Sequence, residues 1–472
     1  MRTSRIAAFV PLCLLLLLVS KMSSVRADHR EVRRAYKPLR DDENWAWLRA
    51  TSASDYWDPI KYLRVTPWRS DLYLTIGGEV RLWGEFFQHE QWGSTGHARD
   101  GAFLQRYMLH ADAHLTRHLR VFVQLKSGLA AFQEDGPGPV DQDLLDFNQL
   151  YLDLIAIPGA TLDDEPRLLL RGGRQELSFG SGRLVEVREG PNVRFGYDGI
   201  RLIARPGRAR IDAFALRPNV TAPGAFDDRW DSSQWFWGLY STYNLPFLTV
   251  DAYYLGRQRD RATYERGQAS ELRHTVGGRA RATLRSIELE LEAAYQFGSF
   301  GALPISAWTV AGELQLRSEN LPLHPRLILG GGITSGDGGA ASPSLGTFSA
   351  LFPRGAYFGL LAPNGPANNF APHAGLQLSL PASLTLLTEL WAFFRESVHD
   401  GVYSVPGTLF RAGQGHPSRY LGTQTETWLT WQASRHLLLS TTFGYFWAGS
   451  FLRDNPPDED TTYVAAWMTY KF

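Results

Sequence analysis

Hydrophobic and polar residues alternate strictly through the stretch from Thr275 to Phe297. In its first half, Val276 and Leu284 share one face, while Arg279 and Arg281 share the other. Its second half sets an apolar face against a row of glutamates, Glu288, Glu290 and Glu292. A period of two predicts β-strands, and arms longer than about ten residues exceed the usual strand of about 5–6. This hairpin alone fits a soluble sandwich and a membrane barrel about equally.

The same length and alternation recur along the whole chain, in eighteen segments. They are 72–88, 102–117, 119–131, 145–157, 167–178, 197–206, 208–217, 234–243, 246–258, 272–285, 287–298, 306–318, 325–334, 371–381, 383–396, 420–433, 436–448 and 462–472. An even number of long alternating strands is typical of a closed barrel in a membrane. Segment ends inferred from sequence shift by several residues, so 16 strands stay an alternative. We predict an all-β fold, a transmembrane antiparallel β-barrel of about 18 strands.

The predicted connections alternate between short turns and long loops. The short turns include 117–119, 206–208, 244–245, 285–286, 381–383 and 433–434, and the long loops include 88–101, 132–143, 180–196, 221–233, 336–370, 397–419 and 449–461. A barrel inserted from the periplasm places tight turns inside and large loops outside, whereas a sandwich has no reason to separate them. The chain also ends on Phe472 after an apolar alternating segment, which resembles the last strand of bacterial outer-membrane proteins.

The N-terminus has the features of a secretory signal. Arg2 and Arg5 precede the apolar run 6–19, and Ala27 ends an A-x-A-like segment. The run is shorter than the roughly 20 residues that span a membrane, which favours cleavage over an anchor. The predicted organisation is a signal peptide (1–27), a periplasmic N-terminal segment (28–71) and a β-barrel (72–472) in the outer membrane of a Gram-negative bacterium.

Composition narrows the class of function. The one cysteine, Cys13, lies in the predicted signal peptide, so the mature chain has no thiol chemistry and no disulfide. Residues 1–27 hold four of the 48 basic residues and no acid, so 44 basic and 48 acidic residues remain, a net charge of −4. That balance does not suggest a nucleic-acid partner. Aromatic residues make up 13% of the chain, as expected where a surface faces lipid and its interfaces.

The charged face of the alternating strands is expected to line the lumen, because a lipid-facing Arg or Lys near the midplane costs about 2–4 kcal/mol. One interpretation is that these charges pair between neighbouring strands and hold the wall together. The other is that some arginines stay unpaired and bind passing carboxylates, which a guanidinium contacts bidentately. The candidate lumen residues of the strands are Glu79, Arg81, Glu85, Arg106, Lys126, Arg201, Arg279, Arg281, Glu288, Glu290, Glu292, Glu313, Arg317, Glu389 and Arg395.

The segment 174–201 contains a long loop rich in charge. We predict that loop 180–196 folds into the channel as a constriction; an outer loop with internal salt bridges is the alternative. Arg171 and Arg174 cannot both face inward in a regular strand, and a bulge at 172–173 would reconcile them. The candidate residues are Arg174, Glu176, Arg183, Arg188, Asn192, Arg194 and Asp198.

Evidence for metal or enzyme chemistry is weak. His110, Asp112 and His114 share one face of a strand, a possible metal site without a fourth ligand nearby in sequence. Lumenal hydrogen bonding is the more ordinary role for such residues. The chain has no Gly-x-Ser-x-Gly, zinc-hydrolase or P-loop motif. We therefore expect no enzyme activity, no cofactor and no bound metal.

Four stretches resemble the alginate export porin family. They are 58–62 leading into LTIGGEVRLWGE (74–85), GRQELSFG (173–180) followed by Arg183-Leu184, NVRFGYDGIRL (192–202), and the loop motifs at 335–337, 347–348, 351–355 and 368–370. The resemblance implies an outer-membrane barrel of 18 strands whose charged lumen passes an anionic polysaccharide. The family's alginate exporter has a strongly electropositive channel, whereas this chain places rows of Glu beside its Arg.

The predicted function is a passive outer-membrane channel for an anionic, alginate-like polysaccharide or related acidic sugars. The rival within the same fold is a general or selective porin for small sugars or organic acids. An enzyme or adhesion scaffold that uses the long loops is a different class. The expected partners are outer-membrane lipid, an anionic polysaccharide or small acidic solute, and periplasmic export components.

Overall fold

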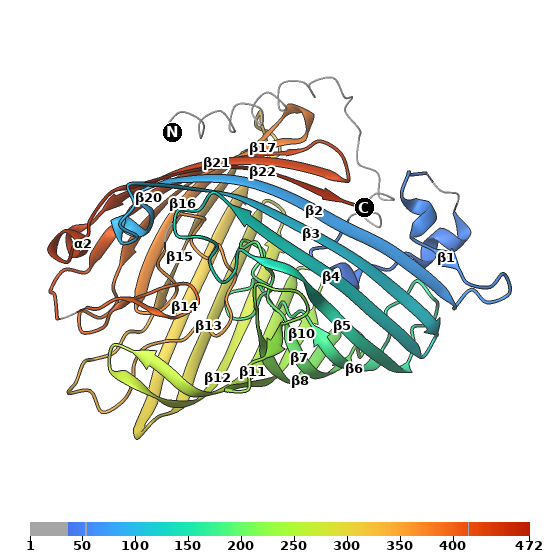
Figure 1. Cartoon of the computed structure of the whole chain (residues 1–472), viewed down its shortest axis with the longest axis horizontal. Helices are drawn as coiled ribbons and strands as arrows, with labels where there is room; N and C mark the ends of the chain where they lie inside the picture. The colour runs from blue at the N-terminus through green and yellow to red at the C-terminus, as the bar shows by residue number, and fades with distance from the viewer. Residues whose placement is uncertain (1–35, 52–53, 362, 414) are drawn as a thin grey trace.

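The computed structural model describes residues 36–472, except 52–53, 362 and 414. The expected signal peptide, with Cys13, lies outside the described residues. Within them, eighteen long strands form one antiparallel sheet that closes on itself (Figure 1). The barrel strands are β2 (Tyr73–Gln88), β3 (Arg99–Thr116), β4 (Leu119–Ala131), β5 (Asp143–Ile157), β6 (Leu168–Gln175), β7 (Tyr197–Ala204), β8 (Ala209–Val220), β10 (Gln234–Asn244), β11 (Leu248–Tyr264), β12 (Gly267–Leu284), β13 (Ile287–Phe300), β14 (Leu303–Arg317), β15 (Arg326–Thr334), β16 (Asn369–Leu380), β17 (Leu384–Phe394), β20 (Tyr420–Gln432), β21 (Leu437–Ala448) and β22 (Thr461–Lys471).

The first and last barrel strands close the sheet. β2 pairs antiparallel with β22 from Glu79↔Lys471 to Gln88↔Thr462, so no barrel strand has a free edge. Each of the eighteen segments predicted from sequence overlaps one barrel strand, which confirms the predicted fold and the count of 18 rather than 16.

The described part of the chain also contains short strands and helices outside the barrel wall. The short strands are β1 (Leu63–Arg64), β9 (Arg229–Trp230), β18 (Val402–Tyr403) and β19 (Leu409–Arg411); the one α-helix is α2 (Ser450–Asp454), and five 3₁₀ turns cover Arg40–Asp42, Ala46–Ala50, Asp58–Ile60, Glu90–Gly93 and Pro381–Ser383. None of the described helices has the length and apolar character needed to cross a membrane.

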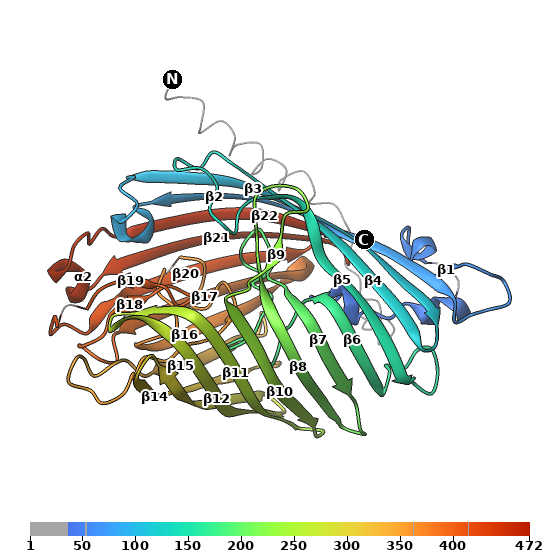
Figure 2. The same ribbon diagram turned by 60° about the horizontal axis from the view of Figure 1, so that its bottom comes forward.

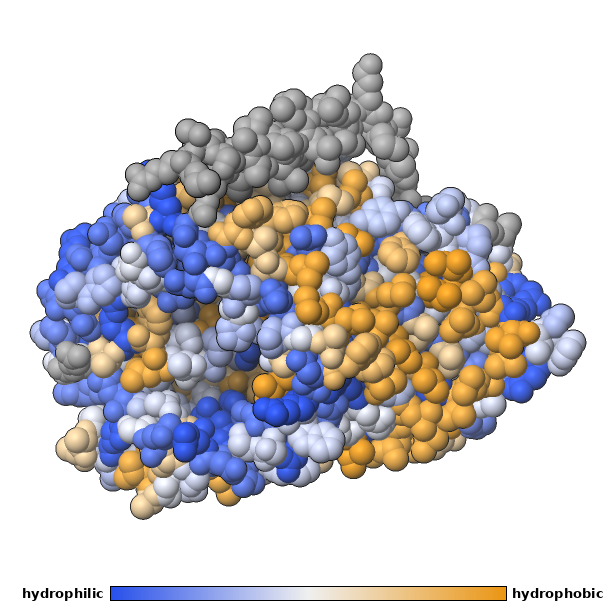
Figure 3. Space-filling model, in the orientation of Figure 1, coloured by the Kyte–Doolittle hydropathy of each residue, from blue (hydrophilic) through white to orange (hydrophobic). Residues whose placement is uncertain are grey.

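The alternation along each strand separates an apolar outer face from a polar inner face. In β5, Leu150 and Leu154 are 41% and 49% exposed. Their neighbours Gln149 and Asp153, which point to the other face, are fully buried. Leu291 of the opening hairpin is 50% exposed, as predicted for an outward position. Figure 3 shows hydrophobic residues gathered over the region of β4 to β6, beside a hydrophilic end that carries α2. A bilayer requires this arrangement of side chains.

The two ends of the barrel differ in their connections. The long loops gather at the end that carries α2, the long-loop end, and mostly short connections lie at the other, the short-turn end (Figures 1 and 2). The predicted alternation is incomplete, because β11–β12 and β13–β14 are joined at the long-loop end by two-residue turns, 265–266 and 301–302. The strands there extend further than their alternation indicated, since charged residues at 257–273 interrupt the apolar pattern.

The N-terminal segment 36–71 contacts the inner wall at the short-turn end. Asp41 pairs with Arg171 at 2.6 Å and accepts a hydrogen bond of 3.0 Å from Tyr151, and both partners face the lumen. At the rim, Arg49 pairs with Asp163 in the β5–β6 connection. This segment therefore occupies part of the barrel mouth.

Candidate functional site: a charged lumen narrowed by two inner loops

Two long loops fold into the barrel and pack against each other. We name residues 176–196 inner loop A and residues 335–368 inner loop B. Val185 and Phe352 form a parallel bridge between them. The Phe352 N–H donates to the Leu184 carbonyl at 2.9 Å, and the Glu186 N–H donates to the Phe352 carbonyl at 2.9 Å. The described loops thus behave as one hydrogen-bonded body inside the lumen.

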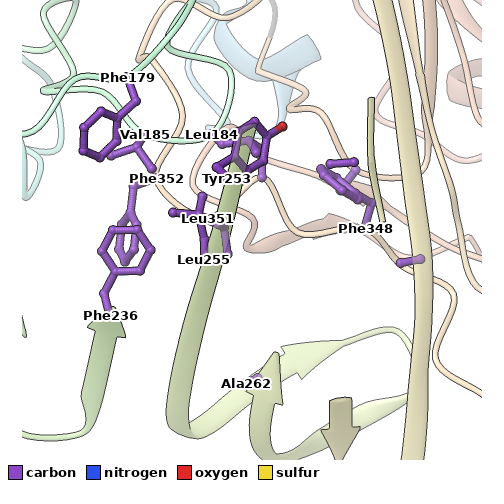
Figure 4. Close-up of a cluster of buried hydrophobic side chains, with 14 of the residues drawn as sticks. Phe179, Leu184, Val185, Phe236, Tyr253, Leu255, Ala262, Phe348, Leu351 and Phe352 are labelled. Atoms are coloured by element: carbon purple, nitrogen blue, oxygen red, sulfur yellow. The ribbon is translucent and has the colours of Figure 1, made fainter. Parts of the chain in front are cut away.

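An aromatic seam fixes this body to one side of the wall. The Phe352 ring packs edge-on against Phe236 of β10 at 4.9 Å and against Tyr197 of β7 at 5.3 Å. On loop A, Phe179 stacks on Tyr240 of β10 at 4.5 Å. Figure 4 shows Phe352 beside Phe236, with Leu184 and Val185 of loop A above them. One hydrophobic cluster of this barrel therefore lies between the loops and strands β7 to β14, and a second lies on the side of β2, β17 and β20 to β22.

Ion pairs fix inner loop A to the opposite side of the wall. Arg106 of β3 pairs with Glu79 of β2 at 2.6 Å and with Glu189 of the loop. Within the loop, Arg194 pairs with Glu176 at 3.0 Å and with Glu189 at 3.3 Å. The Arg106–Glu189 pair on one side and the aromatic seam on the other hold loop A across the lumen.

Burial and neighbouring groups shift the pKa values of two carboxylates in loop A. Burial raises the pKa of Glu189, but the Arg106 and Arg194 guanidiniums outweigh burial and hold it below its ordinary value. Burial raises the pKa of Glu186, and hydrogen bonds from the backbone oppose that shift only in part. Loop A therefore carries a firmly ionised carboxylate at Glu189.

Glycines let the two loops meet closely at a neck. A Cβ on Gly355 of loop B would lie 2.4 Å from the Pro191 Cδ of loop A, and one on Gly190 would lie 3.4 Å from the Ala356 nitrogen. On the short-turn side, the neck faces a cavity of about 1470 Å³, which we name the vestibule. Two smaller cavities of about 320 and 340 Å³ lie beyond it, and residues near the neck line all three. The neck therefore lies where the three cavities approach one another, since Ala356 lines all of them.

Two arginines beside the neck have no ionic partner. Arg81 donates from Nη1 to the Glu189 carbonyl at 2.8 Å and from Nη2 to the Pro191 carbonyl at 2.7 Å. Arg354 donates to the Tyr357 carbonyl at 3.3 Å. Among the described residues, no carboxylate oxygen lies within 4 Å of either guanidinium, and the Nε atoms of both lack hydrogen-bond partners. Both side chains line the vestibule.

Most other candidate residues pair along the wall. In β12 and β13, Arg279 reaches Glu290 at 2.8 Å, and Arg281 pairs with Glu288. Arg183 of loop A lies 4.0 Å from Glu290 and 3.6 Å from Glu292. The remaining pairs are Arg201–Asp212 at 2.7 Å, Lys126–Asp143 at 2.9 Å, Glu313–His373 at 3.7 Å and Arg317–Glu319 at 3.4 Å.

Other candidates contact neutral groups. Glu85 accepts hydrogen bonds from Trp83 at 3.0 Å and Tyr463 at 2.9 Å. Asn192 donates to three backbone carbonyls, and Arg188 lies over the Phe195 ring at 4.6 Å. Arg395 follows β17 and donates to carbonyls of the loop at the long-loop end, and Glu389 lines the 320 Å³ cavity.

The structure places Arg174 and Asp198 on the outward side. The β6–β7 register runs without a shift from Arg171↔Arg201 to Arg174↔Asp198; the predicted bulge at 172–173 was wrong. Arg174 lies opposite Leu150, an outward residue, and pairs with Asp198 at 3.1 Å and Asp146 at 3.2 Å. Strict alternation therefore sends Arg171 into the lumen and Arg174 away from it.

The candidate metal residues of β3 do not converge. Arg120 donates hydrogen bonds to both carboxylate oxygens of Asp112, at 2.7 and 3.0 Å, and His114 lies 3.3 Å from the same carboxylate. His110 stacks on Phe122 instead. In the described chain, three acidic ligand atoms do meet at Asp143, Asp146 and Asp228. Lys126 lies 2.9 and 2.7 Å from the first and last of these, so cationic side chains fill that cluster.

Sequence reasoning missed two parts of the site. Arg354 was read only as part of a loop motif, because a loop has no periodicity that shows where its side chains point. Trp467 and Trp428 were also missed, although alternation carries that signal: Trp467 lies on the face opposite Ala466 and Met468 and pairs with inward Trp83.

Comparisons with known proteins agree on the fold. OccAB2 of Acinetobacter baumannii has a TM-score of 0.57 and 12% identity, over 84% of this chain and 98% of its own. OccD3 (OpdP) of Pseudomonas aeruginosa has a TM-score of 0.55 and 12% identity, over 88% and 93%. OccK2 (OpdF) of Pseudomonas aeruginosa, solved in complex with glucuronate, has a TM-score of 0.53 and 13% identity, over 84% and 98%. The curated proteins include no match.

At these identities, the solved structures show a shared fold, that of outer-membrane porins. The family evidence comes from sequence, because the family described as "Alginate export" matches residues 72–466, nearly the whole barrel. The chain therefore belongs to the alginate export family.

Proposed function

We propose that this protein is a passive channel of the Gram-negative outer membrane, and that it carries acidic sugars, above all an alginate-like polyuronate. Family membership and the porin fold support a channel for sugars or acids. The observation that carries the proposal is the pair of unpaired guanidiniums, Arg81 and Arg354, beside the neck. A solute carboxylate would find guanidiniums there that have no described protein carboxylate within 4 Å.

The same geometry favours transport over tight binding. Both guanidiniums already donate to backbone carbonyls, so a passing carboxylate would compete for a few donors only. A channel must bind its solute weakly and repeatedly if the solute is to leave. The paired charges elsewhere on the wall serve the barrel itself, so the selective step is assigned to the neck.

Planar-bilayer conductance tests the proposal. We expect oligomannuronate added on the vestibule side to block the wild-type current, and Arg354→Gln to weaken that block and reduce the preference for anions. Arg208→Gln is the matched control, since Arg208 is exposed in the β7–β8 turn. An equal block by acetate and oligomannuronate would favour a porin for small acids. Wild-type current that oligomannuronate leaves unchanged would refute the proposal.

A further inference from the structure

Three tryptophans form an aromatic surface on the vestibule wall. Trp83 of β2 and Trp467 of β22 pair in register, and their rings stack at 4.1 Å with an interplanar angle of 13°. Trp428 of β20 meets Trp467 edge-on at 5.5 Å and 88°. β2 and β22 pair at the barrel seam, and β20 is separated from β22 by one strand, β21 (Figure 1). All three indoles line the 1470 Å³ vestibule.

Packing explains only part of this surface, because Trp83 is 5% exposed in a buried cluster against which Trp467 packs, whereas Trp428 is not in that cluster. Trp467 and Trp428 keep part of their surface exposed, and the Trp428 Nε1 has no hydrogen-bond partner among the described residues. Trp391, in the neighbouring cavity, differs because His373 covers its ring at 3.8 Å. A buried indole N–H usually finds a partner, and apolar rings in a polar lumen lose the benefit of burial. The exposed faces of Trp467 and Trp428 therefore point to a ligand with an apolar face.

Cations lie beside the aromatic surface. The Arg81 guanidinium carbon lies 5.2 Å from the centre of the Trp83 ring, and Lys471 of β22 projects into the same cavity, 3.6 Å from Glu79. Arg354 lines the vestibule from inner loop B. A ligand lying on the indoles would thus place an acidic group within reach of the neck.

We propose that Trp83, Trp467 and Trp428 form a stacking site for the pyranose rings of a uronic-acid chain. The C–H face of a pyranose ring is apolar and matches the exposed indole faces of Trp428 and Trp467, and its carboxylate turns toward the half-buried Arg354. The inference rests on the proposed function and adds to it a surface that contacts the sugar ring separately from the carboxylate. The tryptophans act before the neck, by orienting the chain.

The test separates the ring from the charge. Hexamannuronate carries rings and carboxylates, hexaglutamate carries carboxylates alone, and both are added to single channels in planar bilayers. We expect Trp428→Leu and Trp467→Leu to shorten the residence time of the hexamannuronate block about tenfold. Hexaglutamate block and open conductance should change less than twofold. Trp447→Leu is the control, since Trp447 of neighbouring β21 is an outward residue.

Two variants are used in case one of them misfolds. Loss of Trp467 breaks a ring stack, whereas Trp428 has no stacked partner and its loss leaves no hydrogen bond unsatisfied. Unchanged hexamannuronate residence in Trp428→Leu, or an equal loss for hexaglutamate, would overturn the stacking site and leave the proposed channel intact. A wild-type channel that hexamannuronate never blocks would overturn both. A selective loss of the hexamannuronate block supports the stacking site.

Discussion

Arg40 joins the N-terminal segment to the seam of the barrel. Its Nη2 donates to the backbone carbonyl of Phe472, 432 residues away, at 2.9 Å, and its Nη1 donates to the Gly78 carbonyl at 2.8 Å. The Arg40 Nε pairs with Glu43 at 2.8 Å, and both side chains are buried. Since Gly78 belongs to β2 and Phe472 directly follows β22, one guanidinium connects the segment to both sides of the seam.

Arg40→Ala should release the N-terminal segment from the barrel mouth. Removing one partner of a buried ion pair costs about 3–5 kcal/mol, because the other charge is left buried and unpaired. Limited proteolysis should then cut 36–71 at least tenfold faster, while the barrel stays resistant. Arg49→Ala is the control, because the Arg49–Asp163 pair is partly exposed and worth about 1 kcal/mol or less. Equal cleavage of both variants would contradict the role given to Arg40.

Lys61 should make docking of the same segment dependent on pH. Burial first, and the Arg40 guanidinium second, lower its pKa to about 7. Its Nζ donates to the Ile76 carbonyl at 2.9 Å and lies 5.3 Å from the Trp45 ring. In the released segment the pKa returns toward 10.5, so the released state binds more protons between pH 7 and 10.5. Docking therefore strengthens as pH rises through that window, and below pH 7 the cost of burying the charge is complete.

Hydrogen exchange of residues 55–65 at several pH values measures this effect. After correction for intrinsic rates, protection should be greater at pH 9 than at pH 6.5. Lys61→Met should remove most of the difference, because it removes the amine whose pKa burial lowers. His110, whose ring lies close to the Lys61 amine, is kept in both proteins. A wild-type protein with pH-independent protection would contradict the assignment to Lys61.

The strands of this barrel were predictable because the pleat itself carries the signal. Leu150, Gln149 and Asp153 took the faces that their parity indicates, since successive side chains must alternate. Strict alternation also predicts that Arg174 faces outward. We instead expected this arginine in the lumen and therefore predicted a bulge. The sequence therefore predicts which face of the wall each of these residues occupies, as long as strict alternation is assumed.

The inner loops were not predictable to the same extent. Folding of loop 180–196 into the channel was predicted from its charges, and the contacts of Glu189 with the lumenal residues Arg106 and Arg81 agree with it. Nothing periodic marks Phe352 as the residue that meets loop A, because its partners Val185 and Phe236 are distant in sequence. Arg354 owes its place in the lumen to that contact.

Arg174→Gln should leave the ion selectivity of the channel unchanged. The residue lies opposite Leu150 on the outward side and pairs with Asp198 and Asp146. Loss of the pairs leaves two carboxylates without their partner, at a cost of about 1–3 kcal/mol. The reversal potential in a salt gradient should match wild type, while the apparent melting temperature falls. A reversal potential shifted toward cations, as expected for Arg354→Gln, would place Arg174 in the ion path instead.

Phe352→Ala should loosen the two inner loops and widen the neck. The ring packs on Phe236, Tyr197 and Phe195, and removing a buried Phe side chain costs about 3–5 kcal/mol of packing. Because Phe352 also forms the bridge to Val185, that loss acts on both loops together. Phe370→Ala is the matched control, since Phe370 of β16 is 42% exposed on the outer face.

Single-channel recording distinguishes a loosened neck from a damaged barrel. We expect Phe352→Ala to raise the mean conductance and to add rapid fluctuations, because the loops then sample positions away from the wall. Heat resistance on a denaturing gel should stay close to wild type, since the strand pairing is untouched. If the conductance of Phe352→Ala equals that of wild type and of Phe370→Ala, the inner loops do not limit the current, and the selective step must lie elsewhere along the lumen than at Gly190 and Gly355.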